Sequence, residues 1–340
     1  MQQIADLCNV SRGTVDRVLH NRPNVHPQIR QTVLRVIEQT GYRMPVASGA
    51  QPRRLVAILP GWSEKYFVTR SRRGIRTAVD RLDSERFTLQ IEQLDGRSRE
   101  ELLAALDRAL EEGVQGILLN APMDRAVIER VNRATAHGVR VVTYFDELPQ
   151  CPDTYYVGPD VVRAGRVAAG LMAKYLRIGE RVLAVTGDLQ FHSHRGRGYS
   201  FAHHLQELTG QSGLAEIVCA QETFEATAQI VQQQLARDER VRYIYMATQS
   251  VPGCMEGIRR AKLPYRVTVI CNDTTTAARE LLESGAIDFV IGQSASQVAC
   301  QAVETLYKMV CLDTLPRTHK LYSDLTIYTK QMLHVKGRER

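Results

Sequence analysis

The chain has 340 residues, a net charge of +7 and 44% hydrophobic residues, which is the composition of an ordinary globular protein. This length is enough for two or three domains, and no apolar run approaches the roughly 18–20 residues of a membrane helix. The first residues lack the pattern of a secretory signal, and the seven cysteines stand singly without a C-x-x-C pair. We therefore expect a cytoplasmic protein with reduced thiols, no metal and no membrane contact.

Positive charge is concentrated at the start of the chain. Residues 1–54 contain eight arginines and three acidic residues, a net charge of +5, whereas the other 286 residues carry only +2. A small basic unit joined to a nearly neutral body favours a polyanion as the partner of the first unit. The alternative is that the arginines only solvate a small domain.

Three short helical patterns occupy the first 41 residues. "QIADLC" predicts a helix over residues 3–8. Ser11 is a suitable N-cap for a second helix to about His20, because its hydroxyl can accept from a free backbone N–H. A third helix is predicted to begin at Pro27 and to stop at Gly41. A helix, a tight turn and a second helix predict a helix-turn-helix unit, whose second helix enters the DNA major groove.

The second helix carries unusual residues on its open face. Val15 lies on the buried side, whereas Arg12, Gly13, Asp16 and Arg17 lie opposite. The two arginines can pair with guanine or grip phosphate. Gly13 costs about 1 kcal/mol of helix stability relative to alanine, and it lets the helix backbone approach the bases. Asp16 lies one turn after Arg12 and can hold its side chain in place.

The stretch "IADLCNVSRGTVDRVLHNRPNVHPQIRQTVLRVIEQTGYRMP" resembles the DNA-binding headpiece of the LacI/GalR family of bacterial transcription regulators. The resemblance implies that Arg12 and Gly13 read bases and that Arg17 is the arginine of the recognition helix. It also implies that Ser11 and Thr14 contact phosphate, for which capping and packing alone are the alternative. A homodimer on a near-palindromic operator is implied as well.

The segment after "GYR" departs from that family, which has a short hinge helix with a leucine that inserts into the minor groove. Here the stretch reads "MPVASGAQPRR", with Gln51 near the position of the leucine. Pro45, Gly49 and Pro52 oppose a stable helix. We expect a DNA-binding domain at residues 1–45 and a linker at 46–54 without minor-groove insertion.

From residue 55 onward, short apolar runs alternate with amphipathic stretches. The expected strands are 55–59, 87–94, 116–119, 139–145, 181–187, 215–220, 241–247, 266–271 and 289–292. The expected helices include 98–112, 160–176, 274–284 and 295–310. This alternation predicts parallel sheets with helices on both faces, and its length fits two doubly wound lobes. The first lobe is expected at 55–158 plus 292–320, and the second at 159–291 plus 321–330.

The body, residues 55–330, resembles the periplasmic sugar-binding proteins. Its matching motifs are "YYVGPDVVRAGRVAA", the R-x-x-G of "RGRGYSFAHHL", "VTVICND" and "GAIDFVIGQ". The resemblance implies that a sugar-like effector binds between the lobes to Arg195, Asp273 and Gln293. It also implies that Tyr66 and Phe67 stack on a sugar ring. Carboxylate, amide and guanidinium groups suit vicinal hydroxyls, and ends of parallel strands open into such a crevice.

Other interpretations of these residues stay open. Arg195 could be a surface ion-pair partner, Asp273 could be the N-cap of a helix beginning at Thr274, and the two aromatic residues could belong to the core. Two positions also differ from the family: Val161 replaces an asparagine, and Phe145 stands where an acidic or amide residue often lies.

Enzyme motifs are missing from the sequence. It contains no G-x-G-x-x-G after the first strand, no G-x-x-x-x-G-K-[ST] and no G-x-S-x-G. The histidines at 192, 194, 203 and 204 lack the spacing of a helical zinc site and are expected on a solvated loop and helix face. We therefore expect a repressor without cofactor that responds to a sugar or sugar derivative. The alternative is a cytoplasmic α/β enzyme that acts on a sugar.

Overall fold

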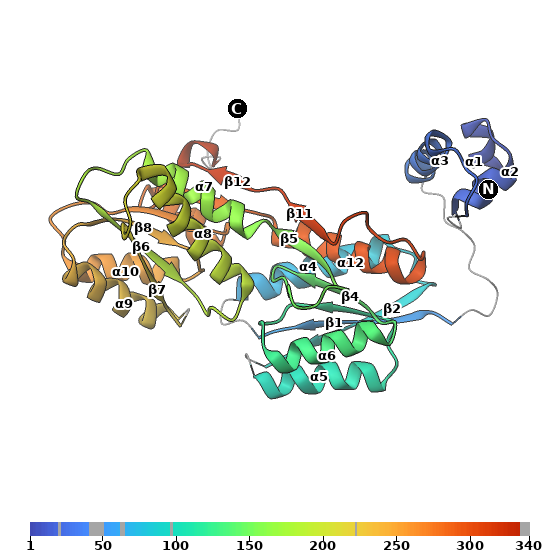
Figure 1. Ribbon diagram of the computed structural model, residues 1–340, viewed down its shortest axis with the longest axis horizontal. Helices are drawn as coiled ribbons and strands as arrows, with labels where there is room; N and C mark the ends of the chain where they lie inside the picture. Colours follow the sequence, from blue (N-terminus) through green and yellow to red (C-terminus); the bar gives the residue numbers. More distant parts are fainter. Residues whose placement is uncertain (20–21, 41–50, 62–64, 96–97, 222, 334–340) are drawn as a thin grey trace, which may run out of the picture.

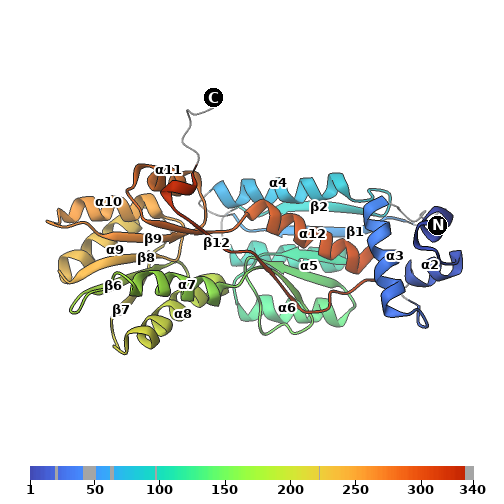
Figure 2. The ribbon, with the colours of Figure 1, turned by 90° about the horizontal axis from the view of Figure 1, so that it is seen from above.

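The computed structural model describes residues 1–19, 22–40, 51–61, 65–95, 98–221 and 223–333. They form a small helical headpiece and two α/β lobes that lie end to end (Figures 1 and 2). Each lobe contains one six-stranded sheet. This is the predicted fold class, an all-α helix-turn-helix unit followed by two doubly wound lobes. In the described part of the chain, no helix is long and apolar enough to span a bilayer.

The headpiece consists of α1 (Gln2–Cys8), α2 (Arg12–Leu19) and α3 (Pro27–Thr40). Asn9 adopts the left-handed conformation with φ 51° and so ends α1 in a tight turn. The backbone N–H of Thr14 donates to Ser11 Oγ at 3.1 Å, which confirms Ser11 as the cap of α2. Apolar side chains of all three helices form the core, namely Ile4, Ala5, Val15, Val18 and Val33.

The first lobe is a flavodoxin-like sheet with strand order β11-β5-β4-β3-β1-β2. Its strands are β1 (Arg53–Leu59), β2 (Phe87–Gln93), β3 (Gly116–Leu119), β4 (Arg140–Tyr144), β5 (Tyr155–Pro159) and β11 (Lys320–Ser323). Its helices are α4 (Lys65–Arg81), α5 (Arg99–Glu111), α6 (Arg125–Ala136) and α12 (Ala295–Cys311).

The second lobe repeats this order as β12-β10-β9-β8-β6-β7. Its strands are β6 (Arg181–Thr186), β7 (Ala215–Cys219), β8 (Val241–Met246), β9 (Thr268–Asn272), β10 (Phe289–Gly292) and β12 (Thr326–Tyr328). Its helices are α7 (Val161–Ala173), α8 (His192–Thr209), α9 (Phe224–Arg237), α10 (Val251–Ala261) and α11 (Thr276–Ser284), with a 3-10 turn η1 (Lys330–Met332).

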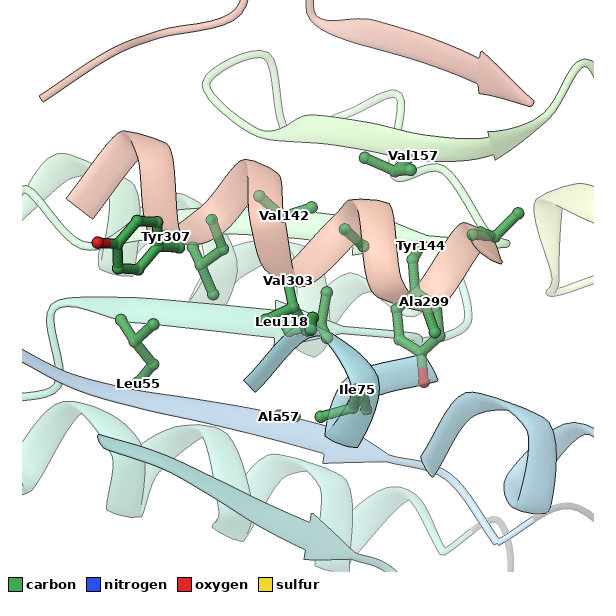
Figure 3. Close-up of a cluster of buried hydrophobic side chains, with 14 of the residues drawn as sticks. Leu55, Ala57, Ile75, Leu118, Val142, Tyr144, Val157, Ala299, Val303 and Tyr307 are labelled. Carbon is green, nitrogen blue, oxygen red and sulfur yellow. The ribbon is translucent and has the colours of Figure 1, made fainter. Parts of the chain in front are cut away.

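Helices cover both faces of each sheet, so the strands are buried on both sides. In the first lobe, α4 and α12 cover one face, and α5 and α6 cover the other (Figure 1). Figure 3 shows Val303 of α12 beside Leu118 of β3, and Ile75 of α4 beside Ala57 of β1. Such burial on both faces explains why the strands read as nearly continuous apolar runs.

The boundary between the lobes differs from the expected one at the end of the chain. The sequence places residues 321–330 in the second lobe, but β11 pairs in parallel with β5 of the first sheet. Only β12 joins the second sheet, antiparallel to β10. The chain therefore crosses between the lobes after β5, after β10 and between β11 and β12. β1 begins at Arg53, so the expected linker of residues 46–54 overlaps its first two residues.

Candidate effector pocket and DNA-binding face

A pocket lies between the two lobes, where the carboxyl ends of both sheets meet. It is lined by Phe67, Ser71, Asn120, Tyr144, Phe145, Asp146, Ser193, His194, Arg197, Thr248, Gln249, Asp273 and Gln293. Its cavity volume is about 30 Å³. A cavity needs roughly 10–15 Å³ to hold one water molecule, so the lobes are close together here. A ligand the size of a monosaccharide needs them to separate before it can enter.

Strand ends supply most of the polar side chains of this pocket. Asn120 directly follows β3, and Asp146 lies two residues after the end of β4. Gln249, Asp273 and Gln293 follow β8, β9 and β10 of the second lobe in the same way. Side chains at the carboxyl ends of parallel strands gather at one edge of a sheet, which is where open α/β sheets bind ligands.

Arg197 and Asp273 form a buried ion pair in the pocket. Arg197 Nη1 lies 3.3 Å from Asp273 Oδ2, and the two residues are only 6% and 3% exposed. Burial by itself would lower the pKa of Arg197, but the negative charge around it, that of Asp273 above all, raises this pKa above its ordinary value. The guanidinium therefore stays charged inside the protein.

The backbone holds Asp273 in place. Its φ of 69° is in the left-handed region, and its N–H donates to the carbonyl of Ile291 at 2.9 Å. Such outliers persist where the surrounding structure enforces them, often at ligand sites. The cap of α11 is Thr275, whose Oγ1 accepts from the N–H of Ala278 at 3.1 Å. Asp273 is therefore a pocket residue and not the N-cap of α11.

The structure brings only some of the predicted effector residues together. Phe67, Asp273 and Gln293 line the pocket, and Phe67 also packs in the first-lobe core. Tyr66 lies outside the lining and packs edge-on against Phe67 with ring centroids 5.6 Å apart. Arg195 is exposed, with Nη2 3.4 Å from Met123 Sδ of the first lobe. The guanidinium in the pocket is that of Arg197, two residues further along α8.

The first lobe contributes an acidic residue, Asp146, that is not among the residues predicted from the sequence. Asp146 lies beside Phe145, whose φ of 64° turns the chain at the end of β4. Asn120 Nδ2 donates to the carbonyl of Tyr144 at 2.8 Å and to Asp146 Oδ2 at 3.0 Å. An acidic side chain thus lies one residue after Phe145, the position at which the family often has an acidic or amide residue. In the sequence, Asp146 could have been found as the first polar residue after the apolar run "VVTYF".

Four buried polar atoms of the pocket lack a hydrogen-bond partner in the described part of the chain. They are Asn120 Oδ1, Arg197 Nε, Gln249 Oε1 and Gln293 Nε2. Asn120 is oriented by the carbonyl of Tyr144, which can only accept from Nδ2, and Gln293 Oε1 accepts from Ser323 Oγ at 3.0 Å. A buried unpaired polar group costs about 1–3 kcal/mol, so two acceptors and two donors around one cavity indicate a bound polar ligand.

The histidines form the predicted solvated face only in part, because His194 departs from it. His194 is buried and lines the pocket, with Nδ1 3.2 Å from the carbonyl of Asp188. His192 is half-buried, whereas His203 is exposed on the far side of α8. The described residues contain no group of three or more His, Cys, Asp or Glu side chains arranged to hold a metal ion.

The open face of α2 exposes the predicted DNA-contacting residues. Arg12, Gly13 and Arg17 are exposed, whereas Ser11 and Thr14 share a hydrogen bond of 2.9 Å at the start of the helix. Asp16, expected to hold Arg12, forms an ion pair with Arg22 at 3.4 Å. The linker residues Pro45 and Gly49 lie outside the described residues, whereas Gln51 and Pro52 are exposed and precede β1.

Gly13 has no steric role within the headpiece. A Cβ at this position would meet no atom closer than Ser11 Oγ at 3.8 Å. Gly13→Ala should therefore stabilise α2 by about 0.5–1 kcal/mol, because alanine is the better helix former. If the helix backbone approaches bases, the added methyl group should weaken operator binding. Amide exchange in the headpiece and operator titrations would test both effects, and unchanged operator affinity would contradict the close approach.

Comparison with known proteins agrees with this division into parts. Residues 56–313 match the family model described as periplasmic binding protein domain, and residues 1–44 match bacterial regulatory proteins, lacI family. No curated protein matches the chain.

Solved structures of similar fold include a sugar-binding protein and solute binding proteins with bound sugars. GanP, a glucose-galactose binding protein from Geobacillus stearothermophilus, is 18% identical with a TM-score of 0.73, covering 84% of this chain and 100% of its own. A solute binding protein from Burkholderia graminis in complex with D-arabinose is 18% identical with a TM-score of 0.71, covering 84% and 98%. One from Agrobacterium vitis with bound D-fucose is 18% identical with a TM-score of 0.72, covering 82% and 96%.

Proposed function

Because the chain belongs to the LacI/GalR family of bacterial transcription regulators, with a lacI-type headpiece before a periplasmic binding protein domain, we propose that an uncharged sugar controls its binding to operator DNA. The sugar binds between the lobes, to Arg197, Asp273 and Gln293 from the second lobe and to Asn120 from the first. The unpaired donors and acceptors of this pocket carry the proposal.

The mixture of unpaired groups selects the class of effector. Asn120 Oδ1 and Gln249 Oε1 need donors, whereas Arg197 Nε and Gln293 Nε2 need acceptors. A hydroxyl group can do both, whereas phosphate and ionised carboxylate groups only accept. Among the described residues of the lining, the only arginine is Arg197, which is already paired with a carboxylate, and Asp146 adds a second negative charge. A polyhydroxy compound without phosphate or carboxylate fits both conditions.

Aromatic rings supply an apolar wall to the same pocket. Phe67 and Phe145 both line it and pack edge-to-face with ring centroids 5.2 Å apart. Rings of this kind contact the C–H face of a sugar, while polar groups fix its hydroxyls. The D-arabinose and D-fucose bound by solved proteins of similar fold support the same class of ligand.

The effector changes the affinity for DNA by changing the relative orientation of the two lobes. A ligand held by both lobes favours the closed arrangement over an open one. This change moves the headpieces and so alters their affinity for the operator. We propose this binding role in preference to the alternative of an enzyme that acts on a sugar. We also propose that the protein is cytoplasmic, because its operator DNA lies there. The lacI-type headpiece supports both statements.

A screen with matched sugars tests the effector class. D-glucose, D-galactose, D-arabinose and D-fucose are compared with the 6-phosphates of the two hexoses, at equal concentrations, in thermal unfolding of the full chain. A neutral sugar at a hundred times its Kd should stabilise the protein by about 2.7 kcal/mol. The active sugar should also change the affinity for an operator selected from random DNA. Stabilisation by a sugar phosphate but not by its parent sugar would contradict the uncharged class.

We also propose a homodimer, since one headpiece offers too little surface for tight specific binding. Helices α4 and α5 of the first lobe are the candidate contacts. Sedimentation at micromolar concentration should give twice the chain mass of 38.3 kDa, with two headpieces bound per operator. A monomer that binds one half-site at a time would contradict this proposal.

A further inference from the structure

Helix α8, which carries Arg197, begins without a cap of its own. Its N-cap residue is Phe191, which makes no side-chain hydrogen bond to the first turn. Most neighbouring helices are capped by a side chain from their own N-cap residue, namely α5, α6, α7, α9, α11 and α12. The first N–H groups of a helix need such partners, because they have none within the helix.

The missing cap comes from the other lobe. Asp146 Oδ1 of the first lobe accepts from the backbone N–H of Ser193, the second residue of α8, at 2.9 Å. Asp146 is 2% exposed, and its other oxygen accepts from Asn120 Nδ2 at 3.0 Å. A carboxylate at a helix N-terminus is favoured both as a hydrogen-bond acceptor and by the helix dipole.

The segment that leads into α8 makes further contacts across the cleft. The N–H of Met123, in the first lobe, donates to the carbonyl of Gln190 at 2.8 Å. Arg195 Nη2 lies 3.4 Å from Met123 Sδ in the same place. The start of α8 is thus held against the first lobe at three points, of which Asp146 is the deepest.

We propose that Asp146 is a positioning residue, which caps α8 across the cleft and thereby fixes Arg197 when the lobes are closed. Arg197 lies about one turn after Ser193, and its guanidinium is paired with Asp273 Oδ2 at 3.3 Å. Asp146 therefore acts on the effector through the first turn of α8. This inference rests on the proposed function only for the role of Arg197.

Hydrogen exchange of the full chain without any sugar tests the cap directly. Asp146→Ala should speed exchange of the first-turn amides of α8 by about two- to thirtyfold, the range that loss of an N-cap produces. Asp146→Asn should keep most of the protection, because asparagine is also a good cap. The first turns of α6 and α9, capped by Asp124 and Thr223, are internal controls for the two lobes and should not change.

A second pair of variants keeps the test decisive if Asp146→Ala does not fold. Ser193→Pro removes the N–H that Asp146 accepts, at a first-turn position that tolerates proline, whereas Ser193→Ala keeps it. Small-angle scattering should show a larger radius of gyration for Ser193→Pro and an unchanged one for Ser193→Ala.

Three results would overturn the proposal. The first is an unchanged exchange rate of the α8 amides in Asp146→Ala, and the second is a loss of protection in Asp146→Asn equal to that in Asp146→Ala. The third is faster exchange of the α6 amides with no change in α8, which would indicate a role within the first lobe alone. Since no sugar is present, these outcomes do not depend on whether the effector is a sugar. If no sugar stabilised the protein but Asp146→Ala still made the α8 amides exchange faster, the proposed effector class would be contradicted and the proposed cap would be supported.

Discussion

Replacing Arg197 with methionine should abolish the response of operator binding to the effector and lower the free energy of unfolding by about 3–5 kcal/mol. Methionine replaces the apolar stem of arginine but carries no charge, so Asp273 is left buried without its partner at 3.3 Å. One of the unpaired donors offered to the effector, Arg197 Nε, is lost as well. Urea unfolding and operator titrations, with and without the sugar that stabilises the protein, measure the two effects.

Arg195 offers a matched control on the same helix. Arg195→Met makes the same change two residues away at an exposed position, where substitutions usually alter stability by less than about 0.5 kcal/mol. It should keep both operator binding and the effector response. A second control, Arg197→Met with Asp273→Asn, removes both charges and should recover much of the lost stability but not the response. An Arg197→Met protein that still responds would show that this pocket is not the effector site.

The helical face of α8 explains why Arg197 lines the pocket and Arg195, predicted from the R-x-x-G motif, does not. The buried residues of α8 include Arg197, Phe201 and Leu205, spaced four apart, whereas Arg195 aligns with exposed Tyr199. The R-x-x-G spacing selects Arg195, because Gly198 follows it by three residues, whereas Ser200 follows Arg197 by three. The apolar periodicity of the helix was present in the sequence and could have identified Arg197 instead.

Most strands were predictable, because helices cover both faces of each sheet and the inner strands are buried and mostly apolar. The missed strands lack that signal. β11 reads "KLYS" and β12 reads "TIY", and both alternate between exposed and half-buried positions at the edges of the sheets. β5, "YYVGP", is fully buried but contains glycine and proline, two residues that are uncommon in strands. Tertiary pairing with β4 and β11 forms it instead.

The pocket shows a limit of a different kind. Asp273 and Gln293 were predictable as polar residues at strand ends, and the same rule applies to Asn120 and Gln249. Asp146 differs, because its role depends on a helix of the other lobe 47 residues away in sequence. Contacts across the cleft depend on how two separately folded lobes meet, and no local pattern records that.

Removing both arginines from the open face of α2 should give the largest loss of operator binding. A side chain that reads a base contributes about 1–3 kcal/mol, so Arg12→Ala with Arg17→Ala should weaken binding by roughly 2–6 kcal/mol. Both side chains are exposed and lie outside the headpiece core, so the fold should be kept. The variants are measured by titration of the selected operator and of a scrambled duplex, at several salt concentrations.

The kind of affinity loss in each single variant shows whether Arg12 or Arg17 contacts a base or a phosphate. A base contact is lost on the operator alone and relaxes specificity at one position, whereas a phosphate contact weakens both duplexes and reduces the salt slope by about 1. Arg35→Ala is the charge-matched control, because Arg35 is exposed on α3, away from the recognition helix. We expect Arg12→Ala to behave as a base contact, since Gly13 beside it leaves room for the helix to approach the groove. If both α2 variants bound the operator as well as Arg35→Ala does, α2 would not be the recognition helix.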